Sequence, residues 1–352
     1  MKEVDYIIVG QGLAGSVLAY SLMQKNKKVL VVDEEAASSS SRVAAGLCNP
    51  VVFKRLTQSW MIDKVFPLAK EFYREQEELL KDKFYFDVPI YKLFVDKKEQ
   101  EFWKQESNEP HLFDWIDDKV EHPFDKELVN YPFGAAKTLQ SGFLKTVNWL
   151  ASFREYLIEN EAYLNAKFDY DKIVFNENGA SWNNYSAQKI IFCEGYQSIY
   201  NPYFDWLPFK LTKGEVLTIN FKNLKVDAAV NKGAFLLPFD ENYKFGATYN
   251  WDDIDNEATV EGKEQLLKRA ERFINDEVII LEHKAGVRPT VLDRRPLLGM
   301  HPEHEQLAVF NGLGTKGVML APYFANKMVN LILDNEKLPS EVDIKRFNKN
   351  PI

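Results

Sequence analysis

Hydrophobic and polar residues alternate along the first part of the chain in a pattern typical of a strand, a helix and a second strand. Residues 6–9 form a short apolar run, and residues 13–25 place apolar side chains at helical spacing. Residues 29–32 form a second, wholly apolar run, as expected of a buried parallel strand. The three elements fit within the roughly 30 residues of a βαβ unit.

The turn after the first predicted strand reads Gly10-x-Gly12-x-x-Gly15, and Asp33 ends the second strand, 18 residues after Gly15. Gly10 permits a tight turn, Gly12 lets backbone N–H groups approach a pyrophosphate, and Gly15 lets the helix pack closely on the strand. The start of the helix supplies unpaired N–H groups and partial positive charge. Asp33 is placed to accept hydrogen bonds from ribose hydroxyls. This context predicts a dinucleotide site and disfavours an ordinary βαβ unit without a ligand.

The remaining sequence mixes helical and strand patterns. A block of short strands is predicted over 211–249, whereas 97–132 shows no clear periodicity. Strand, glycine turn and helix return near the C-terminus, which predicts two interleaved domains. Helices are predicted over 57–81 (kinked or split at Pro67), 144–160, 260–274 and 321–333.

Composition narrows the function classes. The chain has 352 residues, a formal net charge of −8 and a pI of about 5.4, so it lacks an overall basic footprint for nucleic acid. Its two cysteines, Cys48 and Cys193, exclude a disulfide framework and suit a reducing, cytoplasmic location. No apolar stretch has the length of a membrane span. The five histidines show no metal-ligand spacing, and no metal site is predicted.

A second group of motifs lies near the C-terminus. Gly286-x-Arg288-Pro289 is followed by Asn311-Gly312-x-Gly314-x-x-Gly317, which leads into the last helix. Together with the N-terminal unit and with Ala44-Ala45-Gly46, these motifs resemble the D-amino-acid oxidase / glycine oxidase family of FAD-dependent oxidoreductases. The resemblance spans essentially the whole chain and is weakest over 97–136.

The resemblance implies an α/β fold in which a Rossmann-type FAD-binding domain is interleaved with an α+β substrate domain. An antiparallel sheet of the substrate domain would lie over the flavin. The FAD-binding domain would comprise residues 1–80, 137–205 and 284–352, and the substrate domain residues 81–136 and 206–283.

The family pattern also implies which residues bind FAD. The first glycine turn and Asp33 would hold the ADP half, residues 41–46 would line the pyrophosphate and flavin, and Val174 would contact the adenine side through its backbone. Backbone N–H groups at the last helix would face the pyrimidine oxygens of the flavin, where they stabilise negative charge. The complete set so implied is Gly10, Gly12, Leu13, Ala14, Gly15, Asp33, Glu34, Ser41, Arg42, Ala45, Gly46, Val174, Gly195, Gly312, Gly314, Thr315, Gly317 and Val318. Binding is expected to be non-covalent, with a covalent bond from Cys48 as the alternative.

Three residues are candidates for the substrate side. By the resemblance Arg288 would pair with a substrate carboxylate, the alternative being a structural ion pair. Tyr249 would supply a hydroxyl or only pack. Lys316 stands where relatives carry an arginine, and would attract an anion, assist a charged acceptor near the flavin, or face solvent. Phe235 replaces a tyrosine of the glycine-oxidising relatives, which disfavours glycine itself.

The expected reaction is oxidation of the C–N bond of a small amino acid or secondary amine by hydride transfer to the flavin, with oxygen or a quinone or carrier as electron acceptor. Orientation and desolvation would supply most of the catalysis, so no general base is expected.

A flavin monooxygenase is disfavoured because the last loop lacks a Gly-Asp pair. An oxidase acting on an RNA-borne amine, similar to the oxidase domain that modifies wobble uridines in tRNA, and a non-catalytic flavin-binding protein remain as alternatives. The oligomeric state is left open.

Overall fold

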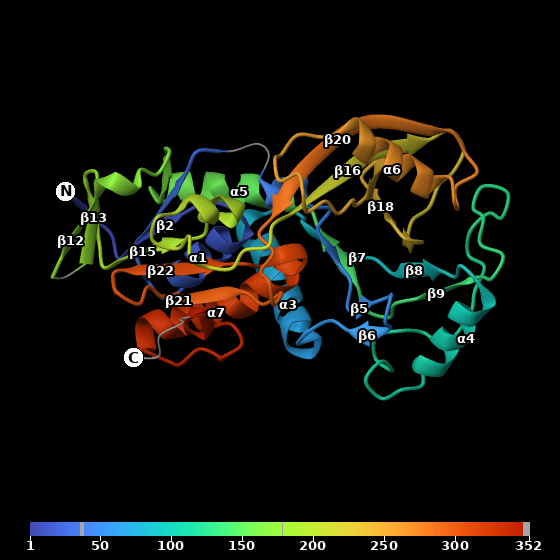
Figure 1. Ribbon diagram of the computed structural model, residues 1–352, viewed down its shortest axis with the longest axis horizontal. Coiled ribbons are helices and arrows are strands. Elements are labelled where there is room, and N and C mark those ends of the chain that lie inside the picture. The colour runs from blue at the N-terminus through green and yellow to red at the C-terminus, as the bar shows by residue number, and fades with distance from the viewer. Residues whose placement is uncertain (36–38, 178, 348–352) are drawn as a thin grey trace.

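A six-stranded sheet forms the centre of the protein, seen on the left of Figure 1, in a computed structural model that describes residues 1–35, 39–177 and 179–347. The predicted βαβ unit is confirmed, and its glycine turn joins the central strand β2 to helix α1. The first five strands in the sheet order run parallel, and β21 is antiparallel to β22. In sheet order the strands are β11 (Tyr163–Asn165), β3 (Val29–Asp33), β2 (Tyr6–Val9), β15 (Lys189–Phe192), β22 (Leu307–Asn311) and β21 (Leu297–Met300).

Side chains alternate between two hydrophobic layers on either side of this sheet, as the apolar strands require. Ile8 and Val31 point into a core shared with the helices, whereas Ile7 and Leu30 point into a core on the opposite face. The helical layer contains α1 (Leu13–Met23), α3 (Ile62–Leu80), α5 (Thr146–Glu159) and α7 (Gly317–Asp334). A four-stranded sheet adjoins the other core, with the order β1 (Lys2–Glu3), β14 (Tyr185–Ala187), β13 (Gly179–Trp182) and β12 (Ile173–Asn176).

A seven-stranded sheet, which we call the roof sheet, lies at the upper right of Figure 1. All its neighbouring strands are antiparallel except β17 and β8. Helix α6 (Val260–Ala270) packs on one of its faces through Leu266. In sheet order the strands are β20 (Val278–Arg288), β16 (Thr212–Phe221), β19 (Asn242–Gly246), β18 (Phe235–Phe239), β17 (Ala229–Asn231), β8 (Ile90–Leu93) and β9 (Ala135–Lys137).

Short elements connect the two large sheets. A three-stranded sheet has the order β4 (Leu47–Cys48), β10 (Gly142–Leu144) and β7 (Tyr85–Asp87), and β5 (Val51–Val52) pairs with β6 (Thr57–Gln58). Helix α2 (Ser40–Val43) follows β3, and 3₁₀ turns lie at Tyr170–Lys172, Gly195–Tyr200, Gly314–Lys316 and Ile344–Phe347.

Two expectations from the sequence were wrong. The helix predicted over 57–81 begins only at Ile62, and it is not split at Pro67, whereas a kink there stays a prediction. Residues 97–132 contain a helix, α4 (Lys97–Glu106), that periodicity did not indicate. The predicted domain boundaries stay a prediction, and we note that β9 and β20 run across two of them. Of the helices in the described ranges, none is long and apolar enough to cross a membrane.

Candidate functional site: a flavin cradle beneath the roof sheet

The glycine turn between β2 and α1 is packed so closely that two of its glycines cannot be replaced. Gly10 has a φ of 101°, and a Cβ atom there would lie 2.6 Å from the carbonyl oxygen of Cys193. A Cβ atom on Gly15 would lie 1.9 Å from the carbonyl oxygen of Gly10. These distances confirm the geometric reasons for glycine that the motif implied.

The start of α1 is arranged to receive an anion. Its N-cap is Gly12, which has no side chain to cap the helix, and the first turn carries no acidic residue. The backbone N–H of Leu13 donates to Ser41 Oγ over 3.2 Å, which brings Ser41 against the turn. The N–H groups of a helix start and its partial positive charge favour a phosphate at this position.

Asp33 is fixed by the backbone on both sides of its carboxylate. Its Oδ2 accepts a 2.8 Å hydrogen bond from the N–H of Gln11, and its Oδ1 accepts one of 2.8 Å from the N–H of Glu35. Each carboxylate oxygen has a further lone pair that a ribose hydroxyl can use. Arg154, which the sequence reasoning missed, donates to Gln11 Oε1 over 2.9 Å and pairs with Glu35 over 3.2 Å, so it steadies this edge of the site.

Val174 is not joined to this group by any contact among the described residues. It lies in β12, at the edge of the four-stranded sheet, with 61% of its side chain exposed. The strand that pairs with β3 is β11, where Asn165 lies opposite Asp33, and the N–H of Ala166 donates to the carbonyl oxygen of Asp33. Residues 163–166 therefore adjoin Asp33, and the adenine contact expected of the Val174 backbone stays a prediction.

The loop before α7 forms an open, polar cradle. Gly312 and Gly314 have φ values of 73° and 56°, and a Cβ atom on Gly314 would approach only Thr290 Oγ1, at 4.0 Å. That hydroxyl is buried and has no hydrogen-bond partner among the residues that the structure describes. Asn311 donates to the carbonyl oxygen of Gly195 over 2.9 Å, which ties Gly195 to the loop. A polar ring bound in this open space would be able to form the hydrogen bond that the buried hydroxyl lacks.

Helix α7 begins at Gly317, four residues earlier than periodicity predicted, and has no side-chain cap. Thr315 belongs to the 3₁₀ turn just before it, and Val318 lies in its first turn. Its N-terminal N–H groups therefore lie next to the cradle without a side-chain cap, and their role toward the flavin stays a prediction.

Lys316 is partly buried, and its side chain is turned toward Ser59, which disfavours the solvent-facing alternative. Its Nζ hydrogen-bonds to Ser59 Oγ, and Ser59 Oγ donates to the carbonyl oxygen of Asn49 over 3.1 Å. Burial lowers the pKa of Lys316 to about 8. Cys48 lies close by, and burial raises the pKa of its thiol to about 12, which keeps the sulfur protonated at neutral pH.

Arg288 ends strand β20 on the face of the roof sheet that is turned away from α6. Its guanidinium donates only to backbone, with 3.3 Å contacts to the carbonyl oxygens of Lys213 and Thr248. A Cβ atom on Gly214 would lie 1.8 Å from Arg288 Nη2, so the arginine occupies space that glycine leaves free. Burial lowers the pKa of Arg288, and no described carboxylate lies within ion-pair distance. The structural ion pair considered for Arg288 is therefore absent from the described residues.

Tyr249 lies directly against this arginine. The guanidinium carbon of Arg288 is 4.6 Å from the centre of the Tyr249 ring, and 52% of Tyr249 is exposed. Whether Tyr249 supplies a hydroxyl to the substrate or only packs on Arg288 stays a prediction. Phe235, which replaces the tyrosine of glycine-oxidising relatives, lies in β18 next to the cluster formed by Ala45, Leu237 and Phe143. This cluster brings the loop that contains Ala45 and Gly46 under the roof sheet.

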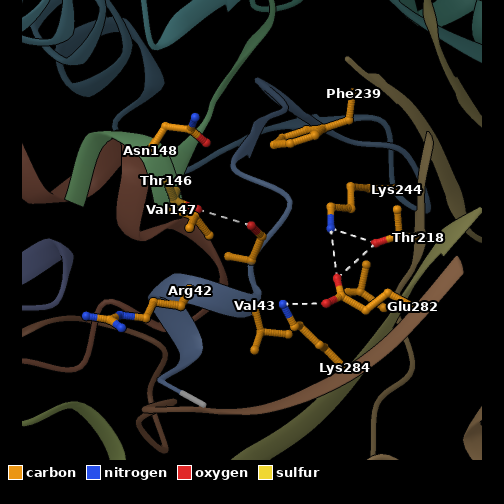
Figure 2. Close-up of a pocket in the computed structure, with 12 residues that line it drawn as sticks. Arg42, Val43, Thr146, Val147, Asn148, Thr218, Phe239, Lys244, Glu282 and Lys284 are labelled. Atoms are coloured by element: carbon orange, nitrogen blue, oxygen red, sulfur yellow. Dashed lines mark hydrogen bonds and ion pairs between the residues drawn. The ribbon is translucent and has the colours of Figure 1, made fainter. Parts of the chain in front are cut away.

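A cleft of about 190 Å³ opens between α2, the start of α5 and the roof sheet, and neither Arg288 nor Tyr249 lines it (Figure 2). On the roof side, Lys284 pairs with Glu282 over 2.7 Å, and Lys244 donates to Thr218 Oγ1 over 2.7 Å. Figure 2 shows the Arg42 side chain pointing away from the centre of the cleft. The roof-side lining carries more positive than negative charge.

No group of histidine, cysteine and acidic side chains in the described ranges could hold a metal ion. His283 Nε2 instead lies 2.7 Å from Glu215 Oε2 on the α6 side of the roof sheet, away from Arg288.

Known proteins that are similar to this chain include flavin-dependent enzymes. A family model described as FAD-dependent oxidoreductase (DAO) matches residues 5–331. The chain therefore belongs to this family, and its cofactor is FAD.

Individual relatives are distant in sequence. An uncharacterised oxidoreductase, YurR, of Bacillus subtilis is 22% identical over 98% of both chains. A tRNA 5-methylaminomethyl-2-thiouridine biosynthesis bifunctional protein, MnmC, of Legionella pneumophila is 24% identical over 85% of this chain, which spans 46% of that relative. The crystal structure of glycine oxidase from Geobacillus kaustophilus has a TM-score of 0.80 with 18% identity, and the match covers 99% of each chain. At this identity the structural likeness establishes the fold alone.

Proposed function

We propose that this FAD-dependent oxidoreductase oxidises the C–N bond of a small amine that carries a carboxylate, such as an amino acid or an N-carboxymethyl secondary amine. The observation that carries the proposal is Arg288, a buried guanidinium with backbone partners and no described carboxylate. A buried cation without a counter-ion is costly unless a ligand supplies one. A substrate carboxylate supplies it in a bidentate geometry.

FAD, held by the first glycine turn and the loop before α7, would supply the two-electron oxidant for the hydride that leaves the carbon next to the amine nitrogen, and the nitrogen would release a proton to water. The substrate becomes an imine, and water hydrolyses the imine to a carbonyl compound and an amine or ammonia. Arg288 fixes the carboxylate, and Tyr249 limits how the substrate can rotate about that contact. Orientation of this kind lowers the barrier without a catalytic base.

Lys316 contributes a positive charge at the start of α7. In its protonated form it adds to the partial charge of the helix N-terminus, and both favour negative charge on a group bound in the cradle. Its hydrogen bond to Ser59 holds the ammonium group in place.

An anaerobic bleaching experiment tests the proposal. Holoenzyme is mixed with D- and L-amino acids, glycine, sarcosine and iminodiacetate while flavin absorbance is followed. Bleaching by a carboxylate-bearing amine supports the proposal, and readmission of air then shows whether oxygen is the acceptor. A yellow protein that none of them reduces, and whose absorbance none of them perturbs, contradicts the role of Arg288.

An amine carried on RNA is a second candidate. The match to the bifunctional tRNA-modifying relatives supports it, as does the roof side of the cleft, where Lys244 and Lys284 outnumber Glu282. Addition of tRNA to the same anaerobic assay tests it, because bleaching by tRNA and not by free amines would replace the first candidate.

A further inference from the structure

Two aromatic side chains next to Arg288 are left open to solvent. Tyr249 is 52% exposed and Trp251 is 56% exposed. Their ring centres are 6.3 Å apart, with an angle of 29° between the planes. Neither residue belongs to a hydrophobic cluster of the described chain. Two adjacent exposed aromatic rings form a small apolar patch, and burial of such a patch against a ligand is favourable because exposure of apolar surface to water costs free energy.

The aromatic pair continues directly from the candidate carboxylate site. The guanidinium carbon of Arg288 lies 4.6 Å from the centre of the Tyr249 ring, and the Tyr249 ring in turn stacks with that of Trp251. A ligand whose carboxylate is held by Arg288 would therefore extend its remaining atoms along these rings.

The turn that carries Trp251 is anchored on both sides. Asn250 and Lys213 exchange two backbone hydrogen bonds, of 2.8 and 3.0 Å. Just after Trp251, Lys213 Nζ donates to Asp253 over 2.5 Å and to Asp255 over 2.6 Å. Lys213 itself is fully buried. An exposed ring on a turn held this firmly loses little conformational freedom when it binds a partner.

We propose that Trp251, together with Tyr249, forms a stacking surface for a planar ring of the substrate, so that the enzyme selects carboxylate-bearing compounds with an aromatic or heteroaromatic group. This inference rests on the proposed function, because it takes Arg288 as the carboxylate site. The ring of the substrate could belong to an aromatic side chain or to a nucleobase, since both present a flat π face.

Matched ligands separate stacking from simple hydrophobic contact. Phenylacetate and cyclohexylacetate share a carboxylate and a six-membered carbon ring, but only phenylacetate has a π face. Stacking on Trp251 is expected to make the holoenzyme bind phenylacetate about three- to tenfold more tightly, measured by isothermal titration calorimetry. Uracil-1-ylacetate distinguishes the two sources: tighter binding than phenylacetate indicates a nucleobase, and weaker binding indicates an aromatic side chain.

Three variants complete the test. Trp251→Leu is expected to abolish the preference for phenylacetate, and Trp251→Phe to retain most of it. Phe113→Leu, which replaces an aromatic residue that is 68% exposed outside the roof sheet, is expected to leave the preference unchanged. Equal binding of the two ligands by the wild type, or an unchanged preference in Trp251→Leu, would overturn the stacking surface. Absence of binding by all three carboxylates would instead contradict Arg288 as the carboxylate site, and with it the proposed function.

Discussion

The ammonium group of Lys316 is hydrogen-bonded to the hydroxyl of Ser59, and the backbone of Lys316 is the N-cap of helix α7. The N-terminus of that helix carries partial positive charge. Burial disfavours the charged form of Lys316 and lowers its pKa to about 8. Negative charge on a group bound near both would be stabilised by them, which is consistent with the proposed place of the pyrimidine end of the flavin.

Replacement of Lys316 is expected to change the redox properties of the flavin in a pH-dependent way. Because the pKa of Lys316 lies at about 8, the side chain is charged below that pH and stabilises an anionic reduced flavin. Lys316→Met should lower the two-electron midpoint potential by about 30 mV at pH 6.5, which corresponds to a tenfold change in the equilibrium. The difference should shrink as the pH rises through and above 8, since Lys316 then loses its proton.

Reductive titrations of both holoenzymes between pH 6.5 and 9.5 measure this difference. Lys327→Met is the control, because Lys327 lies further along α7 and pairs with Glu336. Identical potentials for wild type and Lys316→Met at every pH would show that the lysine does not act on the flavin.

Arg288 should be needed for carboxylate binding and not for FAD. Loss of charged hydrogen bonds to a ligand costs about 10- to 150-fold in affinity, so Arg288→Met should weaken binding of a substrate carboxylate by this factor. Arg288→Lys should recover only part of the lost affinity, because an ammonium group lacks the two parallel N–H donors of a guanidinium. Flavin content and midpoint of thermal unfolding are compared in the same preparations. Arg269→Met is the control, since Arg269 donates to Ala247 from α6. Unchanged affinity in Arg288→Met would exclude a carboxylate contact.

Local sequence patterns were sufficient to predict the first glycine turn and Asp33. Their geometry depends on neighbours within one βαβ unit, so spacing and residue type carry the information. Helix α4 was missed because Trp103 is its only buried residue and periodicity is faint. A local signal was nevertheless present: Asp96 accepts from the N–H of Glu99, and Glu99 accepts from the N–H of Val95, which is a capping arrangement.

Contacts between segments that lie far apart in the chain could not be predicted from a single sequence. Which residue adjoins Asp33 depends on the strand that pairs with β3, and this strand, β11, was not predicted from the sequence. The burial of Lys316 likewise depends on Ser59, which is 257 positions away in the chain. Neither a hydrophobic period nor a motif reports on such contacts, because they are set by the packing of whole elements.

Two glycine substitutions in the first turn should separate FAD binding from folding. A Cβ atom on Gly12 would lie 3.2 Å from Ser41 Oγ, a side chain that can shift, whereas one on Gly15 would lie 1.9 Å from backbone. Gly12→Ala should keep the melting temperature of the apoprotein within about 3 °C of wild type and still weaken FAD binding about tenfold or more. Gly15→Ala should fail to fold. Wild-type FAD affinity in Gly12→Ala, measured by fluorescence titration of apoprotein, would mean that the pyrophosphate does not approach Gly12.

Lys213 and its two aspartate partners hold the turn that carries Trp251. Removal of the lysine and removal of the aspartates should lower the stability of the protein to different extents. Burial pulls the pKa of Lys213 down, but its hydrogen bonds to Asp253 and Asp255 outweigh this effect and raise it. The lysine side chain is fully buried, whereas the two aspartates are 36% and 57% exposed. Removal of both carboxylates, in Asp253→Asn/Asp255→Asn, leaves a buried cation without a counter-ion, which is strongly unfavourable. Lys213→Met leaves only partly hydrated carboxylates, and its apolar side chain fits the buried position.

Urea unfolding should therefore give a lower midpoint for Asp253→Asn/Asp255→Asn than for Lys213→Met, although both remove the same ion pairs. Lys172→Met serves as a reference, because Lys172 forms an exposed pair with Asp169, and such pairs contribute little to stability. The opposite order of midpoints would mean that the lysine is hydrated in solution and that the turn carrying Trp251 is not held as the hydrogen bonds indicate. In that case Trp251 would also be free to move, and both variants should leave the relative binding of phenylacetate and cyclohexylacetate unchanged.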